Sequence, residues 1–125
     1  MKDNFRSISK KYNDDPQGHG THCAGIIGAV TNNGLGVASY ARTSDFIEIS
    51  SVKVLRAGGS GTQQDIIKGM IAAVDAGADV LSMSLGGFST QSRQRAYSEA
   101  VRYATDRGAI VVASAGNSNR DAAGY

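Results

Sequence analysis

The sequence has few of the features that mark disulfide-bonded or membrane-spanning proteins. Of its 125 residues only Cys23 is a cysteine, so no internal disulfide can form and no redox compartment can be assigned from a bridge pattern. The longest apolar runs, such as residues 109–113, are far shorter than the roughly 20 residues that cross a bilayer. Residues 1–6 lack the apolar stretch of a signal peptide. We therefore expect no association of this chain with a membrane.

An excess of charge of one sign is also missing. Lys and Arg number 13 and Asp and Glu 11, a formal net charge of +2. This is far from the dense basic stripe of a nucleic-acid-binding protein, so we predict no nucleic-acid partner. What the chain does have is 41% hydrophobic residues, enough for the core of one domain without a disulfide or a metal. Its 16 glycines cluster at the ends of apolar runs, which favours tight turns between strands and helices.

The order of the predicted elements indicates an α/β fold. Residues 1–18 are polar and weakly patterned, and we predict an N-terminal arm without regular structure, followed by the domain proper over 19–125. Strands and helices are expected to alternate, which implies βαβ units, a parallel sheet and helices on both of its faces. In chain order we predict a buried helix over 19–30, a strand over 46–55, a helix over 65–76, a strand over 79–85, a helix over 92–107 and a strand over 109–114.

Three glycine-containing segments directly follow the predicted strands. They are residues 58–61, 84–87 and 114–117. In open parallel sheets, function collects at the carboxyl ends of the strands. We therefore expect these segments to line one edge.

Both histidines of the chain lie in the segment 18–25, Gly-His-Gly-Thr-His-Cys-Ala-Gly. Small residues around His19 let a substrate approach its imidazole, which can take a proton near neutral pH and so act as a general base. A metal site built on His19 and His22 is the alternative, but the stretch lacks the carboxylate of a His-Glu-x-x-His motif. We favour base chemistry for His19 and a structural role for His22.

Five motifs resemble, in the same order, those of the subtilase family of serine proteases. They are HGTHCAG at 19–25, VKVL at 52–55, GSG at 59–61, MSLGG at 83–87 and SAGN at 114–117. The resemblance covers about residues 15–125 and implies a partial subtilisin-like three-layer fold. It also implies a secreted parent enzyme that cleaves polypeptides as a serine endopeptidase and requires no cofactor. Cys23 resembles the proteinase K-like branch of the family and is expected to pack beneath the imidazole.

The same resemblance assigns roles to individual residues. His19 would be the base of the catalytic triad, and the side-chain amide of Asn117 would donate to the oxyanion. Both would have to face one cleft. Without the other motifs, Asn117 would be an ordinary turn residue. Segments that hold an extended peptide through main-chain hydrogen bonds would supply the substrate-binding residues Gly59, Ser60, Gly61, Ser84, Leu85, Gly86, Ser114, Ala115 and Gly116.

The chain also departs from the family pattern. It contains neither the Asp-Thr-Gly type segment of the triad aspartate nor the segment of the nucleophilic serine, and the strand that carries the aspartate belongs between two of the strands present. We therefore expect the isolated chain to be marginally stable and inactive. A module that binds peptides without cutting them is the alternative function.

One further segment resembles a family site without completing it. Residues 31–37 resemble the calcium-binding loop of subtilisins, but the ligands expected from upstream segments cannot be located. Calcium is therefore left unassigned. The family usually has Gly-Val-Ala-Pro in this region, whereas Ala38-Ser39-Tyr40 follow Val37 here, which leaves the geometry of this loop open.

Overall fold

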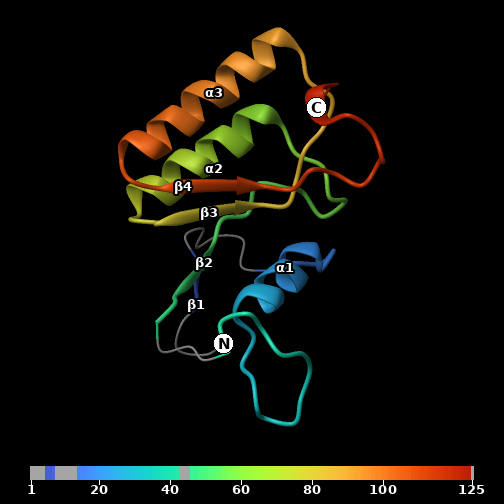
Figure 1. Cartoon of the computed structure of the whole chain (residues 1–125), viewed down its shortest axis with the longest axis vertical. Coiled ribbons are helices and arrows are strands. Elements are labelled where there is room, and N and C mark those ends of the chain that lie inside the picture. The colour runs from blue at the N-terminus through green and yellow to red at the C-terminus, as the bar shows by residue number, and fades with distance from the viewer. Residues whose placement is uncertain (1–4, 8–13, 43–45, 125) are drawn as a thin grey trace. The chain divides into compact units, whose positions relative to one another are not determined.

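The computed structural model describes residues 5–7, 14–42 and 46–124, which belong to two compact units (Figure 1). Unit 1 covers Met1–Gly61 and unit 2 covers Thr62–Tyr125. Helices together with parallel strand pairs confirm the predicted α/β class. Unit 1 contains β1 (Phe5–Ser7), α1 (His19–Gly28) and β2 (Ile49–Ser51). Unit 2 contains α2 (Gln63–Asp75), β3 (Val80–Met83), α3 (Gln91–Asp106), β4 (Ile110–Ala113) and a 3₁₀ helix, η1 (Ala122–Gly124).

Unit 2 is a βαβ arrangement preceded by a helix. β3 and β4 pair in parallel with Leu81 opposite Val111, and α3 connects them. Helices α2 and α3 lie on the same side of this pair (Figure 1). On the other side Val80, Ile110 and Val112 are more than half exposed. The buried apolar residues of unit 2 are Ile66, Met70, Ala73, Val74, Leu81, Ala100, Ala104 and Ala109.

Threonine caps set where the two helices of unit 2 begin. The Thr62 hydroxyl accepts a hydrogen bond from the Asp65 N–H at 3.1 Å, and the Thr90 hydroxyl accepts one from the Arg93 N–H at 3.3 Å. Because these side chains satisfy N–H groups that lack a partner within the helix, α2 begins two residues and α3 one residue before the predicted starts.

Unit 1 contains a strand that the sequence pattern did not predict. β1 pairs in parallel with β2, with Phe5 opposite Ile49. The prediction of an arm without regular structure is therefore wrong at residues 5–7, because pairing with a distant segment overrides weak local propensity. Residues 1–4 and 8–13 lie outside the described part, and residues 14–18 carry no helix or strand.

The described strands form two parallel pairs rather than one continuous sheet. β2 covers three of the ten residues predicted as a strand over 46–55, and its partner is β1. The family resemblance expects a further strand between two of those present, and the described residues supply none. Open strand edges therefore remain within the part of the chain that the structure describes.

Helix α1 is not the buried helix that was predicted. Ile26 and Ile27 are exposed, and only Gly28 of its residues is buried. The prediction of burial is wrong for most of the helix, because a run of small and apolar residues favours burial but does not supply the neighbouring segments that would cover it. Its last residue does pack closely, since a Cβ on Gly28 would lie 2.6 Å from Cδ1 of Ile49.

The segment after Val37 closes the carboxyl end of α1. The Tyr40 N–H donates to the Ile26 carbonyl at 3.0 Å, and the Ala41 N–H donates to the Ile27 carbonyl at 3.1 Å. Carbonyls in the last turn of a helix lack intrahelical donors, so these bonds fix where the helix ends. The loop that departs from the family pattern thus serves as the cap of α1.

None of the helices in the described residues combines the length and the apolar character that crossing a bilayer requires.

Candidate active site

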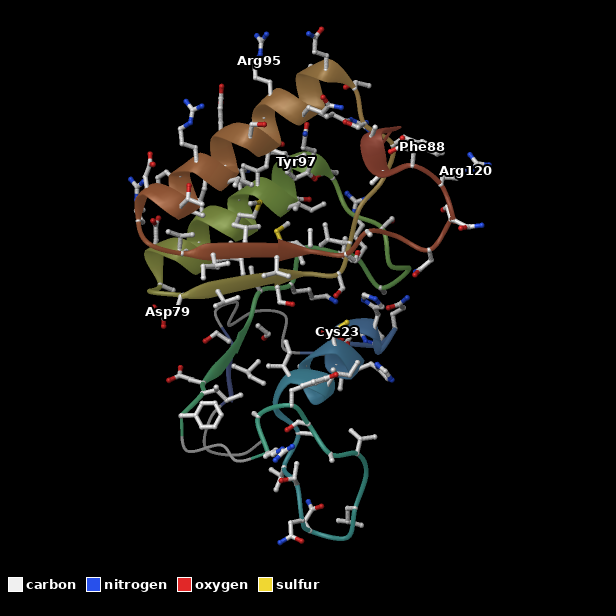
Figure 2. All side chains as sticks on the ribbon, viewed as in Figure 1. Cys23, Asp79, Phe88, Arg95, Tyr97 and Arg120 are labelled. Atoms are coloured by element: carbon white, nitrogen blue, oxygen red, sulfur yellow. The ribbon has the colours of Figure 1, made fainter. Side chains whose placement is uncertain are left out.

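His19 is the first residue of α1. Gly18 precedes it in a left-handed conformation, with φ 84°, and has no side chain with which to cap the helix. The imidazole is exposed, and Cys23 lies one turn further along α1 (Figure 2). The distance from Cys23 Sγ to His19 Nε2 is 3.9 Å, so the thiol contacts the imidazole, while its predicted place beneath the ring stays a prediction. His19 is thus open to a substrate on one side and backed by a half-buried thiol.

Two side chains outside the helix hold its first turn. The Asp15 carboxylate accepts hydrogen bonds from the Gly18 N–H at 3.1 Å, the Thr21 N–H at 2.8 Å and the Thr21 hydroxyl at 2.7 Å. The Gln17 amide oxygen accepts from the His19 N–H at 3.2 Å. The bonds from the Thr21 hydroxyl and N–H, with smaller effects of the Gly18 N–H and Lys53, lower the pKa of Asp15 below its usual value.

Asp15 and Gln17 were not among the site residues predicted from the sequence. A signal was available, because the residue that precedes His19 is a glycine and cannot cap the helix with a side chain. When the capping residue has no side chain, a carboxylate or amide a few residues earlier in the chain can accept the hydrogen bonds of the first helical N–H groups instead.

The predicted substrate segment 59–61 forms a tight turn in the same unit. The Arg56 N–H donates to the Ser60 carbonyl at 2.7 Å, and Gly59 adopts a φ of 86°. A Cβ on Gly59 would lie 3.2 Å from Nε2 of Gln17, the residue that also contacts the His19 backbone. Within unit 1 the structure therefore brings Gly59 close to the segment that leads into His19.

The other two predicted segments meet in unit 2. The Ser114 N–H donates to the Met83 carbonyl at 3.2 Å, which extends the β3–β4 pairing to the point where both segments begin. Two of the three glycine-containing strand ends therefore share an edge, as predicted. Leu85 is half-buried, and the remaining predicted residues here are exposed, namely Ser84, Gly86, Ser114, Ala115 and Gly116.

Asn117 follows this edge after Gly116, whose φ is 86°. Its side chain is exposed, and among the described residues no group is hydrogen-bonded to its amide. The amide is therefore available to donate to a ligand. His19 belongs to unit 1 and Asn117 to unit 2, so the cleft that they are predicted to share stays a prediction.

In the described part of the chain, the side chains that could bind a metal do not gather at one place. His22 is exposed, and within the described ranges no three His, Cys, Asp or Glu side chains gather. Residues 31–37 carry no carboxylate, and Oδ1 of Asn33 accepts from the Leu35 N–H at 3.1 Å. Calcium favours sets of six to eight oxygen ligands, usually with carboxylates, so this loop does not fit a calcium site by itself.

Comparison with known proteins agrees with these motifs. The model of the subtilase family, Peptidase S8, matches residues 2–125. The chain belongs to the subtilase family, a family of serine-type peptidases. It is 46% identical over 108 residues to thermitase of Thermoactinomyces vulgaris, covering 86% of this chain and 37% of that protein. It is 43% identical over 103 residues to the thermophilic serine proteinase of Bacillus sp. (strain AK1), covering 82% and 24%.

A third subtilase, subtilisin DY of Bacillus licheniformis, is 42% identical over 109 residues, with 87% of this chain and 37% of that protein covered. The subtilase chain thus spans well under half the length of each of these relatives.

Proposed function

We propose that this subtilase chain is the histidine-bearing part of a serine endopeptidase that hydrolyses peptide bonds through an acyl-enzyme. The observation that carries the proposal is the exposed His19 at the head of α1, next to the segment that contacts Gly59, in a chain of the subtilase family. An exposed imidazole beside a glycine turn suits a base that must reach a bound polypeptide. The polypeptide is the only partner that the proposal requires.

His19 performs the proton transfers in this mechanism. It accepts the proton of a serine hydroxyl as that oxygen attacks the scissile carbonyl, and it then gives the proton to the leaving amine. The serine comes from a segment that this sequence does not contain, so the chain by itself is proposed to be inactive. No cofactor enters the reaction.

Asn117 is proposed to stabilise the oxyanion that forms during the attack. A neutral amide fixed after a strand meets charge that exists only in the transition state and in the intermediate, so its effect falls on kcat. The segments 59–61, 84–86 and 114–116 are proposed to hold the substrate on either side through main-chain hydrogen bonds, which explains broad side-chain tolerance.

A chimera tests these roles. This chain takes the place of the matched segment in the thermophilic serine proteinase of Bacillus sp., and hydrolysis of a peptide substrate is measured. We expect activity that His19→Ala abolishes and that Asn117→Ala lowers in kcat by about 100- to 1000-fold, the loss known for the equivalent donor of subtilisin. The matched controls His22→Ala and Ser118→Ala should retain activity. A folded chimera whose activity survives His19→Ala would refute the proposal.

A peptide-binding module without catalysis is the second candidate, because main-chain hydrogen bonds from the predicted substrate segments could hold a peptide whether or not it is cut. A fluorophosphonate probe for serine hydrolases, applied to the purified 125-residue chain, is expected to give no labelling. Labelling would contradict the proposed inactivity. Binding of an unlabelled peptide by this chain, combined with an inactive folded chimera, would favour the module over the enzyme.

The finer classification also belongs to the proposal. Cys23, 3.9 Å from His19, supports placement in the proteinase K-like branch. An extracellular location of the parent enzyme is proposed from the family resemblance.

A further inference from the structure

The first turn of α1 depends on groups outside the helix. The first N–H groups of any helix lack intrahelical acceptors, and in α1 the residue at the cap is a glycine without a side chain. The helix also has no acidic residue in its first turn to balance the positive end of its dipole. Whatever fixes the backbone at His19 must therefore come from the preceding segment.

The Asp15 carboxylate accepts hydrogen bonds from residues on both sides of His19. One carboxylate oxygen, Oδ1, accepts from the Gly18 N–H directly before the histidine. The other, Oδ2, accepts from the N–H and the hydroxyl of Thr21, two residues after it. A Cβ on Gly20 would lie 3.7 Å from Oδ2, so the carboxylate also lies against the backbone of the residue that follows His19. Residues 18 and 21, on either side of His19, are thus hydrogen-bonded to one carboxylate.

This arrangement bears on the imidazole because His19 is the first residue of the helix. The direction of its Cα–Cβ bond is set by the backbone torsions of residues 18 and 19, which the bonds to Asp15 constrain. The ring in turn contacts the Cys23 thiol through Nε2, one turn further on. If the first turn frayed, the imidazole would leave this position while the later turns of α1 could remain.

We infer that Asp15 is a positioning residue for the His19 base, which it holds in contact with Cys23 by clamping residues 18 and 21. This inference rests on the proposed function of His19. Asp15 itself does not touch the substrate or the transferred proton. It acts through the backbone, and the Thr21 hydroxyl contributes one of its three hydrogen bonds.

NMR of the full 125-residue chain tests the inference without any need for catalysis. Since the chain has two histidines, the ring signals of His19 are assigned by comparison with His22→Asn. We expect a nuclear Overhauser effect between the His19 ring and the Cys23 β-protons. Asp15→Ala should abolish it and should accelerate amide exchange at Thr21 about fivefold, the size of a lost helix cap. Amide protection at Ala29, which bonds the Gly25 carbonyl, should be retained.

Matched variants separate positioning from general destabilisation. Asp14→Ala removes a neighbouring carboxylate that is also exposed and should leave the His19–Cys23 effect intact. Thr21→Val, which keeps the N–H but loses the hydroxyl, should weaken the effect, and Thr21→Ser should restore it. Persistence of the effect in Asp15→Ala, or its absence in the unmodified chain, would overturn the inference. Loss of protection at Ala29 along with the effect would assign Asp15 a purely structural role and would overturn it as well.

The chimera gives a second readout that depends on the proposed function. There Asp15→Ala should lower kcat about tenfold or more with little change in KM, because a displaced base slows the chemical step rather than binding. An inactive chimera whose NMR spectra behave as expected would refute the protease function and leave the clamp in place. An active chimera whose kcat is unchanged by Asp15→Ala would support the protease function and refute the clamp.

Discussion

The two units of this subtilase chain are stabilised by different kinds of interaction. Among the described residues, every buried apolar side chain except that of Ala41 belongs to unit 2, where two helices pack on one face of the β3–β4 pair. In unit 1 polar side chains make hydrogen bonds to the backbone around α1, with Asp15 and Gln17 at one end of the helix and Ser39 near the other. The predicted base thus lies in the unit with the smaller apolar core.

The difference indicates how each unit should respond to mutation. The stabilisation from burying apolar side chains grows with the area that is buried. Unit 2 should therefore lose stability in proportion to the side-chain volume removed from its core. Hydrogen bonds are local and directional, so unit 1 should fail at individual contacts. The position of the predicted base, His19, would then depend on a few polar side chains rather than on a large apolar core.

The largest effect is expected from Leu81→Ala. Leu81 is 6% exposed beneath α2 and α3, and its truncation should lower the free energy of unfolding of unit 2 by about 3 kcal/mol. Its neighbour Val80 points to the bare face at 55% exposed, so the control Val80→Ala should cost under about 1 kcal/mol. Urea unfolding followed by amide exchange in α2 and α3 measures both. Equal losses would show that the helices do not form the core of unit 2.

Unit 1 offers a matched pair of glycines in the segment 58–61. A Cβ on Gly61 would lie 2.5 Å from the Val54 carbonyl oxygen, a backbone atom that cannot move aside easily, whereas a Cβ on Gly58 would meet nothing within 4 Å. Gly61→Ala should therefore cost about 1 to 3 kcal/mol and shift the turn. Gly58→Ala should be neutral or slightly stabilising, because it restricts the unfolded chain. Chemical shifts of residues 54–61 and thermal unfolding give the comparison, and similar spectra for the two variants would exclude the close contact.

The sequence predicted unit 2 better than unit 1 for a physical reason. Apolar periodicity and glycine stops gave the helices around Met70 and Ala100 and the strands beside them to within a few residues, because the same pattern builds the core. The segment 5–7 has no such pattern, and its strand exists only through pairing with 49–51. At the site, motifs located His19, but the carboxylate that holds its helix lies outside any helical pattern, so only a search for the missing cap would have found Asp15.

A smaller effect is expected at Ser39, a buried polar side chain of unit 1. Ser39 is 6% exposed and donates its hydroxyl hydrogen to the Ala29 carbonyl at 2.8 Å. Ser39→Ala leaves that carbonyl without the bond and should cost about 1 kcal/mol. Val37→Ala, an exposed change two residues earlier, is the control and should be neutral within about 0.5 kcal/mol. Thermal unfolding monitored at the α1 amides distinguishes them, and an unchanged midpoint for Ser39→Ala would mean that another donor replaces the hydroxyl.

The smallest effect is expected from pH, which should change amide exchange at the start of a helix in unit 1 more than in unit 2. The pKa of Asp15 is lowered in the folded state, chiefly by the Thr21 hydroxyl and N–H. Its stabilisation of α1 is therefore complete above the unfolded value of 3.8 and is lost as the pH falls through the lower folded pKa. The start of α3 is capped by the Thr90 hydroxyl, which does not titrate, and the first turn of α3 carries no acidic residue. Amide exchange at Thr21 should thus accelerate in acid more than exchange at Arg93, and Asp15→Asn should remove the contrast, because the asparagine side chain carries no charge at any of these pH values. Equal acid responses of the two amides in the unmodified chain would show that the charge of Asp15 does not hold the helix that carries His19.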